Sequence, residues 1–133
     1  MNTEGAGDKA ARSALTSAYS GATVRRLDFS GAELTSVSGP RLLWLDRCTF
    51  AAADLRQATL DGWHFKLCDL TGANLRGASP RGASFAGCDL TGADLRDTDL
   101  TDVWFGSVGV RRGATATRLD GVLCDAGVSL ELS

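Results

Sequence analysis

The chain has 133 residues, a formal net charge of −2 and a hydrophobic content of 44%. This length and composition predict one domain with a packed core, and the small net charge gives no sign of nucleic-acid or membrane binding. The sequence opens with no secretory signal and contains no apolar run of membrane-spanning length, so we expect a soluble, cytoplasmic protein. Arginine greatly outnumbers lysine, as is common in proteins from GC-rich bacterial genomes.

Residues 1–21 are predicted to form a flexible N-terminus and a short capping helix. Residues 1–7 are polar and glycine-rich, Asp8 is a candidate N-cap, and Ala11, Leu15 and Ala18 lie at helical spacing within residues 9–19. A helix this short is marginal on its own in water. We therefore expect it to cover the open end of the domain that follows.

A five-residue period runs through residues 22–105. From Leu45 to Phe105 an apolar residue recurs at every fifth position except Pro80, and a mostly small residue precedes it by two. The stretch Cys68–Arg76 returns almost unchanged as Cys88–Arg96. Neither an α-helix nor a straight strand keeps residues five apart on one face. The period therefore predicts short extended pieces joined by corners, four pieces to a coil, with coils stacked about 4.8 Å apart.

The apolar and small positions of each unit are predicted to point into the core. Trp63 occupies a small position, and we expect it to be too large to lie fully inside. Three early units, around residues 24, 29 and 34, are one residue out of phase, so we place an extra residue within Thr35–Gly39 and align Pro40 with Pro80. Three of the four cysteines are predicted to be free core thiols. The predicted core comprises Leu45, Phe50, Leu55, Leu60, Phe65, Leu70, Leu75, Phe85, Leu90, Leu95, Leu100, Phe105, Cys48, Cys68 and Cys88.

Residues 106–133 are predicted to form an irregular C-terminal coil and cap. Val108–Val110 fits one further unit, and residues 117–119 and 122–124 fit two others in a shifted phase, with a loop over residues 113–117. Residues 128–132 fit either an edge strand or part of a cap.

The sequence carries no recognisable catalytic or cofactor motif. It has one histidine, His64, no phosphate-binding loop and no metal-ligand spacing of cysteine and histidine. A coil this narrow is filled by its own side chains, which leaves no interior site for a substrate. We predict that the protein is not an enzyme and binds no cofactor or metal.

Three sets of outward residues are candidates for partner binding, and each has a plainer structural interpretation. An arginine column lies beside acidic or amide residues and forms either a salt-bridged surface or a docking strip: Arg56, Arg76 and Arg96. An aromatic set either binds a partner or is covered by a terminal segment: Trp44, His64 and Trp104. An acidic set is either a solvated face or a binding patch: Asp89, Asp94, Asp97, Asp99 and Asp102.

The units Ala53-Asp54-Leu55, Ala73-Asn74-Leu75 and Ala93-Asp94-Leu95 resemble those of the pentapeptide-repeat family. The resemblance implies an all-β fold, a right-handed quadrilateral β-helix with the central and small residues inside. Some members of that family resemble duplex DNA, bind DNA gyrase and protect against quinolones. This chain differs from them in its short length, its near-neutral charge and the lack of an evident C-terminal dimerisation helix.

Our leading hypothesis is a non-catalytic protein–protein interaction module that uses its outer faces, with no direct binding to nucleic acid or membrane. One alternative is a DNA-mimic-like binder of DNA gyrase or topoisomerase that gives antibiotic resistance or self-protection. Another is a structural repeat that self-assembles end to end. The sequence leaves the partner's identity and the choice between monomer and dimer open.

Overall fold

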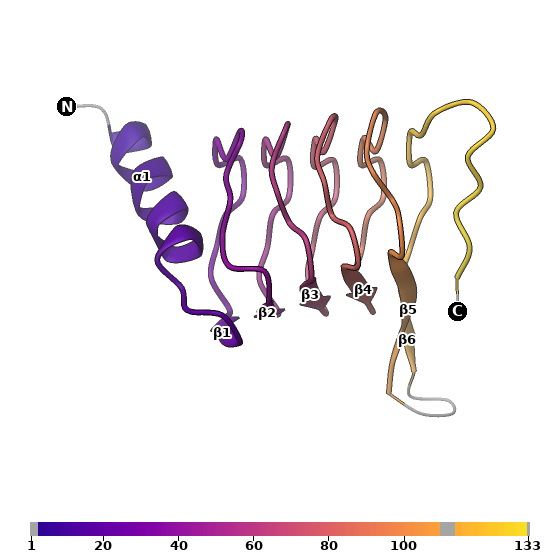
Figure 1. Cartoon of the computed structure of the whole chain (residues 1–133), viewed down its shortest axis with the longest axis horizontal. Helices are drawn as coiled ribbons and strands as arrows, with labels where there is room; N and C mark the ends of the chain where they lie inside the picture. The colour runs from indigo at the N-terminus through magenta and orange to yellow at the C-terminus, as the bar shows by residue number, and fades with distance from the viewer. Residues whose placement is uncertain (1–2, 110–113, 133) are drawn as a thin grey trace.

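A computed structural model, which describes residues 3–109 and 114–132, shows a stack of coils with a helix at its N-terminal end (Figure 1). The fold class is the predicted one, a right-handed four-sided β-helix of about four turns with one short N-terminal helix. No helix within the described ranges is long and apolar enough to cross a membrane. The elements are α1 (Thr3–Thr16), β1 (Ala22–Arg25), β2 (Leu43–Asp46), β3 (Trp63–Lys66), β4 (Ser84–Ala86), β5 (Trp104–Val108) and β6 (Thr115–Ala116).

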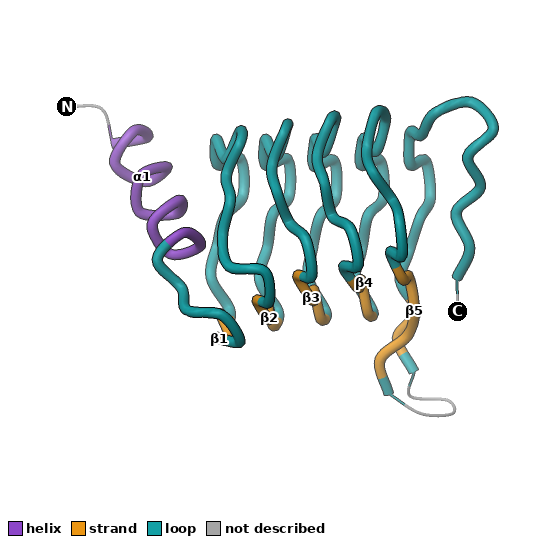
Figure 2. Tube along the Cα trace, viewed as in Figure 1, coloured by secondary structure: helices purple, strands orange, loops and turns teal. Residues whose placement is uncertain are grey.

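Regular strands occupy one side of the solenoid, as Figure 2 shows. Strands β1 to β5 stack in chain order as a parallel sheet, and β6 pairs with β5 in antiparallel orientation. The other sides are joined by single bridges, such as Asp54 with Asn74 and Asn74 with Asp94. The corners need left-handed backbone, which Gly72 adopts (φ 66°) at little cost, whereas Ala52 (φ 56°) adopts it at about 1–2 kcal/mol.

The predicted core residues are buried, with one exception. All are at most 4% exposed except Leu100, which is only half-buried. Leu100 lies on the last complete coil, where no further coil covers it on that side. Inside, the rings of Phe65 and Phe85 stack with centroids 4.8 Å apart, and Phe105 continues the ladder at 5.4 Å from Phe85.

The cysteine column is a line of free, buried thiols that hydrogen-bond from one coil to the previous one. Contact with Cys68 and burial together raise the pKa of the Cys48 thiol, so it remains a protonated donor at neutral pH. The thiols of Cys48, Cys68 and Cys88 donate to the backbone oxygens of Val24, Leu45 and Phe65 at 3.4, 3.3 and 3.3 Å.

Thr117 takes the next place in this column, after the chain has left the solenoid and returned. It is 1% exposed, its hydroxyl donates to the Phe85 backbone oxygen at 2.7 Å, and its hydroxyl oxygen accepts from the Cys88 N–H at 3.1 Å. Arg118 and Leu123 then form parallel bridges with the preceding coil. The two shifted-phase units predicted for residues 117–119 and 122–124 are therefore confirmed.

Trp63 is fully buried, contrary to the prediction. Ser38 bridges Thr59, so the first coil keeps its phase as far as Gly39, and the extra residue comes after Gly39, not before it. Gly39, in place of the predicted Pro40, thus aligns with Leu60 of the next coil. Its missing side chain leaves room for the indole, because a Cβ there would lie 2.7 Å from Cζ2 of Trp63. The indole N–H donates to the Pro40 oxygen at 2.8 Å.

Helix α1 caps the first coil, although its bounds differ from the predicted ones. It begins at Thr3, so residues 3–7 are helical where flexibility was expected, and residues 1–2 lie outside the described part. Asp8 is inside the helix and is not its N-cap; its carboxylate accepts from the Glu33 N–H at 3.1 Å. Arg12 donates to the Thr35 oxygen at 2.6 Å and Leu15 is fully buried. The helix therefore satisfies edge groups and covers the core, as a cap should.

The C-terminal region departs from the solenoid in a hairpin. Val108 ends β5 and does not start another unit, and Thr115–Ala116 form β6 where a loop was predicted. Residues 110–113, over which part of those predictions fell, lie outside the described part. The last described residue, Leu132, forms one parallel bridge with Phe105, so an edge contact is present there.

Candidate functional site

The outer face of β1–β5 carries the predicted aromatic residues in one register: Trp44 pairs with His64, His64 with Ser84 and Ser84 with Trp104. We call these four residues the aromatic row. The rings of Trp44 and His64 stack at 4.3 Å, and Nδ1 of His64 lies 2.7 Å from the Ser84 hydroxyl. Trp44 is 44% and Trp104 41% exposed, so the described terminal segments leave both indoles accessible, although residues 128–131 line a groove beside Trp104.

Charged residues border the aromatic row. A shallow hollow of about 220 Å³ beside Trp44 is lined by Arg25, Asp46 and Lys66 among others. Burial lowers the pKa of His64, so this ring is neutral at neutral pH and presents an uncharged aromatic face. The row thus offers flat aromatic surface with mixed charges at its side, which suits contact with another macromolecule better than proton transfer.

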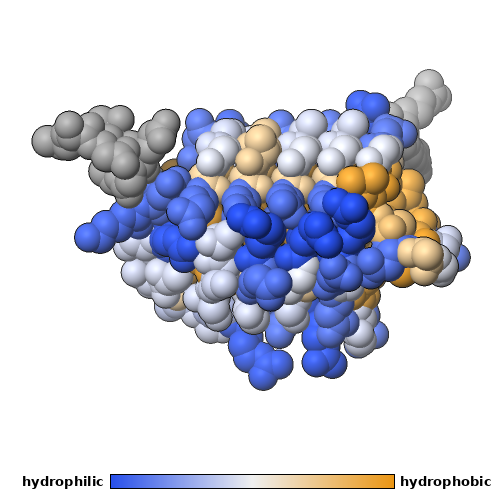
Figure 3. Space-filling view, turned by 90° about the horizontal axis from the view of Figure 1, so that it is seen from above, coloured by the Kyte–Doolittle hydropathy of each residue, from blue (hydrophilic) through white to orange (hydrophobic). Residues whose placement is uncertain are grey.

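Apolar side chains gather toward the end of the solenoid that lies away from α1, whereas the middle of the face shown in Figure 3 is largely hydrophilic. The large exposed apolar residues of this end include Trp104, Leu123, Val128 and Leu132. A groove of about 310 Å³ runs between residues 100–105 and residues 128–131. This groove could not be predicted from the sequence, because the path of residues 106–133 breaks the five-residue period.

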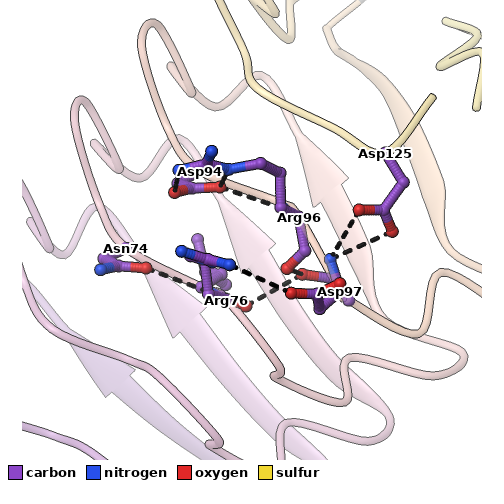
Figure 4. A network of polar contacts seen from close by, with 8 residues as sticks. Asn74, Arg76, Asp94, Arg96, Asp97 and Asp125 are labelled. Carbon is purple, nitrogen blue, oxygen red and sulfur yellow. Dashed lines mark hydrogen bonds and ion pairs between the residues drawn. The ribbon is translucent and has the colours of Figure 1, made fainter.

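The arginine column forms ion pairs within the solenoid surface (Figure 4). Arg56 binds Asp54 through Nε and Nη2 at 2.9 and 2.7 Å, and Arg96 binds Asp94 at the same two distances. Arg76 instead reaches Asp97 at 3.3 Å. These contacts favour the salt-bridged surface over the docking strip. A partner's carboxylates would have to displace the aspartates that the arginine guanidinium groups already bind.

The network of Figure 4 also attaches the C-terminal segment. The carboxylate of Asp125 accepts from the Asp97 N–H at 3.1 Å, and Asn74 accepts from the Arg76 N–H at 3.1 Å. Asp125 was not among the predicted residues. The only signal for it was the shifted unit at residues 122–124, which places the following residue beside the arginine column.

The acidic set is not a uniformly negative patch. Asp94 and Asp97 pair with arginines as above, and Asp99 lies 3.4 Å from Arg81. Hydrogen bonds from the Thr91 hydroxyl and N–H hold the pKa of Asp89 below its usual value. Asp102 is exposed and lines a polar hollow of about 300 Å³ together with Arg41 and Arg81. Each carboxylate except Asp102 is thus neutralised or locally bonded by a described neighbour.

No cluster of three histidine, cysteine, aspartate or glutamate side chains that could hold a metal occurs in residues 3–109 and 114–132. The core is filled by its own side chains, and the hollows named above lie at the surface. The fold and these surfaces define a β-solenoid that presents its variable residues outside a closed core.

A family model matches the central part of this solenoid. The family model for pentapeptide repeats matches residues 45–79 and 64–102, with eight copies of the repeat. Over residues 45–102 the chain therefore carries the repeats that define pentapeptide-repeat proteins. No curated protein matches the sequence.

Three solved structures are similar to this chain, and the first of them shares its fold. A pentapeptide repeat protein from Nostoc is 25% identical with a TM-score of 0.58, and the match covers 75% of this chain and 86% of that one. A pentapeptide repeat protein from the thylakoid lumen of Arabidopsis thaliana is 25% identical with a TM-score of 0.44, over 69% of this chain and 70% of that one. A trypsin-treated form of QnrB1, a plasmid-mediated fluoroquinolone resistance protein, is 25% identical with a TM-score of 0.47; the match covers 75% of this chain but only 44% of the QnrB1 chain.

Proposed function

We propose that the protein is a non-catalytic interaction module that binds another protein on the outer face of β1–β5. The observation that carries this proposal is the aromatic row, in which two indoles are exposed and the ring of His64 is held by Trp44 on one side and Ser84 on the other. Parallel pairing fixes the backbone beneath these rings, so little conformational entropy is lost when a partner binds.

The shape and chemistry of this face favour a protein as the partner. A flat surface encloses no small molecule, whereas protein interfaces are flat and draw much of their binding energy from tryptophan and arginine. The net charge of −2 gives no attraction to nucleic acid, and Arg25, Asp46 and Lys66 present both signs of charge at the side of the row.

A double substitution tests this proposal. Trp44→Ala with Trp104→Ala removes both exposed indoles and leaves the core intact. Proteins captured from the host lysate by the tagged wild-type chain and by this variant are compared by quantitative mass spectrometry. The matched control, Arg56→Ala with Arg96→Ala, changes two exposed residues on another side. We expect the tryptophan variant alone to lose specific partners, and equal capture by all three proteins would contradict the proposal.

DNA gyrase is a second candidate partner, and the acidic set of the last coils is the observation that favours it. The pairing of Asp94, Asp97 and Asp99 with arginines argues against a DNA-like field, so we rank it second. A supercoiling assay with and without a quinolone tests it; no change at micromolar protein would remove gyrase from consideration.

End-to-end assembly is the weakest of the three functions. Helix α1 satisfies edge groups of the first coil through Asp8 and Arg12, so head-to-tail growth would require its displacement. Light scattering over a concentration series tests this: growth of the particle with concentration would support assembly, and a constant monomer would exclude it.

A further inference from the structure

The fourth side of the last complete coil has an unpaired backbone edge. In the second coil two N–H groups donate to backbone oxygens of the next coil. The Leu60 N–H donates to the Ser79 oxygen at 2.7 Å, and the Gly62 N–H donates to the Arg81 oxygen at 2.9 Å. The equivalent donors two coils later belong to Leu100 and Asp102. Neither N–H meets an acceptor among residues 3–109 and 114–132. An edge of this kind is a template for pairing with another extended chain.

Other sides of the same end are covered by the chain itself. The Leu90 N–H donates to Arg118 at 2.9 Å and the Leu95 N–H donates to Leu123 at 2.7 Å. Residues 117–123 therefore act as the next coil on the second and third sides. Figure 1 shows the C-terminal segment running beside the last coil, and on the first side it meets Phe105 through a single bridge. On the fourth side residues 128–131 face the last coil across a groove, and no described backbone acceptor pairs with the N–H groups of Leu100 and Asp102.

An apolar groove opens next to these unpaired donors. Leu100, Val103 and Trp104 form one wall of its 310 Å³ volume, and Val128 and Leu130 line the other. Leu100 is only half-buried because it lines this groove, whereas Leu60 at the same place in an inner coil is fully buried. An inserted side chain would complete the packing that a further coil gives elsewhere.

Two carboxylates flank this site, although Asp102 also lines a separate polar hollow with Arg41 and Arg81. Glu131 lines the groove, and Asp102 stands exposed on the unpaired edge. Asp99, the neighbour of Leu100, is already paired with Arg81. A cationic side chain beside the inserted segment would therefore meet Asp102 and Glu131 without competing for Asp99.

We propose that this edge binds an extended, lysine- or arginine-flanked apolar segment of a partner protein by strand addition. The segment runs parallel to residues 98–102, accepts hydrogen bonds from the N–H groups of Leu100 and Asp102, and places alternate apolar side chains in the groove. This site shares Trp104 with the aromatic row, but its backbone edge and its occupant do not depend on the function proposed for the row.

The binding test uses a synthetic seven-residue peptide of alternating valine and threonine with a lysine at each end. Amide exchange is followed by NMR on the full chain with and without this peptide. We expect exchange of the Leu100 and Asp102 amides to slow about tenfold or more in the complex. Unchanged exchange at both amides with millimolar peptide would overturn the proposal.

Leu100→Pro removes the central donor, and Leu100→Ala is its matched control because it keeps the N–H. Proline is compatible with the fold at this place, since Pro80 occupies it one coil earlier. We expect the proline variant to bind the peptide about tenfold more weakly than the alanine variant. Equal affinities would overturn the proposal.

Two further measurements distinguish strand addition from binding at the aromatic row and from dimerisation. In the inner coils the paired segment also donates, as the Ser79 N–H does to the Ala58 oxygen at 2.8 Å, so the peptide should donate to the equivalent oxygen of Thr98. N-methylation of the peptide nitrogen at that position removes this donor, leaves the protein unchanged and should abolish binding, whereas Trp44→Ala should leave the affinity unaltered. Retained binding of the N-methylated peptide would refute strand addition. If the chain alone dimerises with the Leu100 and Asp102 amides protected, a second copy occupies the edge and the proposal is wrong.

Discussion

Substitution of Gly39 by alanine tests the packing of Trp63 into the first coil. Gly39 has no left-handed backbone requirement, so the substitution adds a methyl group without the strain of a positive φ. That Cβ would lie 2.7 Å from Cζ2 of Trp63 and 2.9 Å from the backbone oxygen of Leu15. Carbon atoms in van der Waals contact lie about 3.5–4.0 Å apart, so the indole and the end of α1 must both shift.

Overpacking of this kind costs about 1–3 kcal/mol of unfolding free energy. We expect Gly39→Ala to lower the urea midpoint accordingly when Trp63 is present. In a Trp63→Leu background the clash with the indole disappears, and the same substitution should cost at least about 1 kcal/mol less. The coupling in this double-mutant cycle measures the contact itself, because the intrinsic effect of alanine at position 39 cancels.

Gly72→Ala is the control for the cycle. A Cβ at Gly72 meets nothing within 4 Å, but the φ of 66° makes any side chain there unfavourable. Its cost should be the same in both Trp63 backgrounds. If Gly39→Ala costs equally with and without the indole, the assignment of Gly39 as the space that admits Trp63 is refuted.

Four other substitutions give three further predictions. Leu75→Lys should unfold the solenoid by circular dichroism, because its fully buried position offers no partner for a charge, whereas Arg76→Ala should shift the urea midpoint little; equal tolerance would refute the core register. Thr117→Val should lower the free energy of unfolding by about 1–3 kcal/mol in the same assay, because the Phe85 oxygen and the Cys88 N–H lose their buried partner. A smaller loss would show that the cysteine column does not depend on that hydroxyl. Hydrogen bonding to Arg96 lowers the pKa of Asp94 in the folded state. This pairing therefore stabilises the fold above the unfolded pKa of about 3.9, and the stabilisation is lost as pH falls through the lower folded pKa. Asp94→Asn should flatten the decline of the urea midpoint below about pH 5, and an unchanged decline would assign that decline to other carboxylates.

The regular part of the solenoid could be predicted because each repeat position meets the same neighbours in every inner coil. The five-residue period alone predicts that Leu55, Leu75 and Phe85 are buried, because each is the central apolar residue of a repeat unit. Trp63 and Gly39 could not be matched in this way, because the space for the indole is made by a residue in a different coil. The prediction that Leu100 is fully buried was wrong for a related reason. Its position in the repeat is that of a core residue, but it lies where the stack of coils ends.

The candidate surfaces were predictable as sets of residues but not in their contacts. The sequence placed Arg56, Arg76 and Arg96 in one column, and only the geometry distinguishes pairing within the coil from the link between Arg76 and Asp97. The C-terminal groove was missed altogether. Its walls come from two segments separated by the β5–β6 hairpin, and no periodicity relates their positions.

The return of Thr117 to the cysteine column has a consequence for how this molecule can change. The hairpin after β5 leaves the stack and comes back in register, and the re-entry point is fixed by two side-chain hydrogen bonds. The length of the excursion therefore has little influence on the coil that follows, because closing a longer loop costs only about 0.6 kcal/mol for each doubling of its length. We therefore expect the connection between β5 and β6 to accept an inserted peptide or a whole foreign domain while the coils on either side keep their alignment.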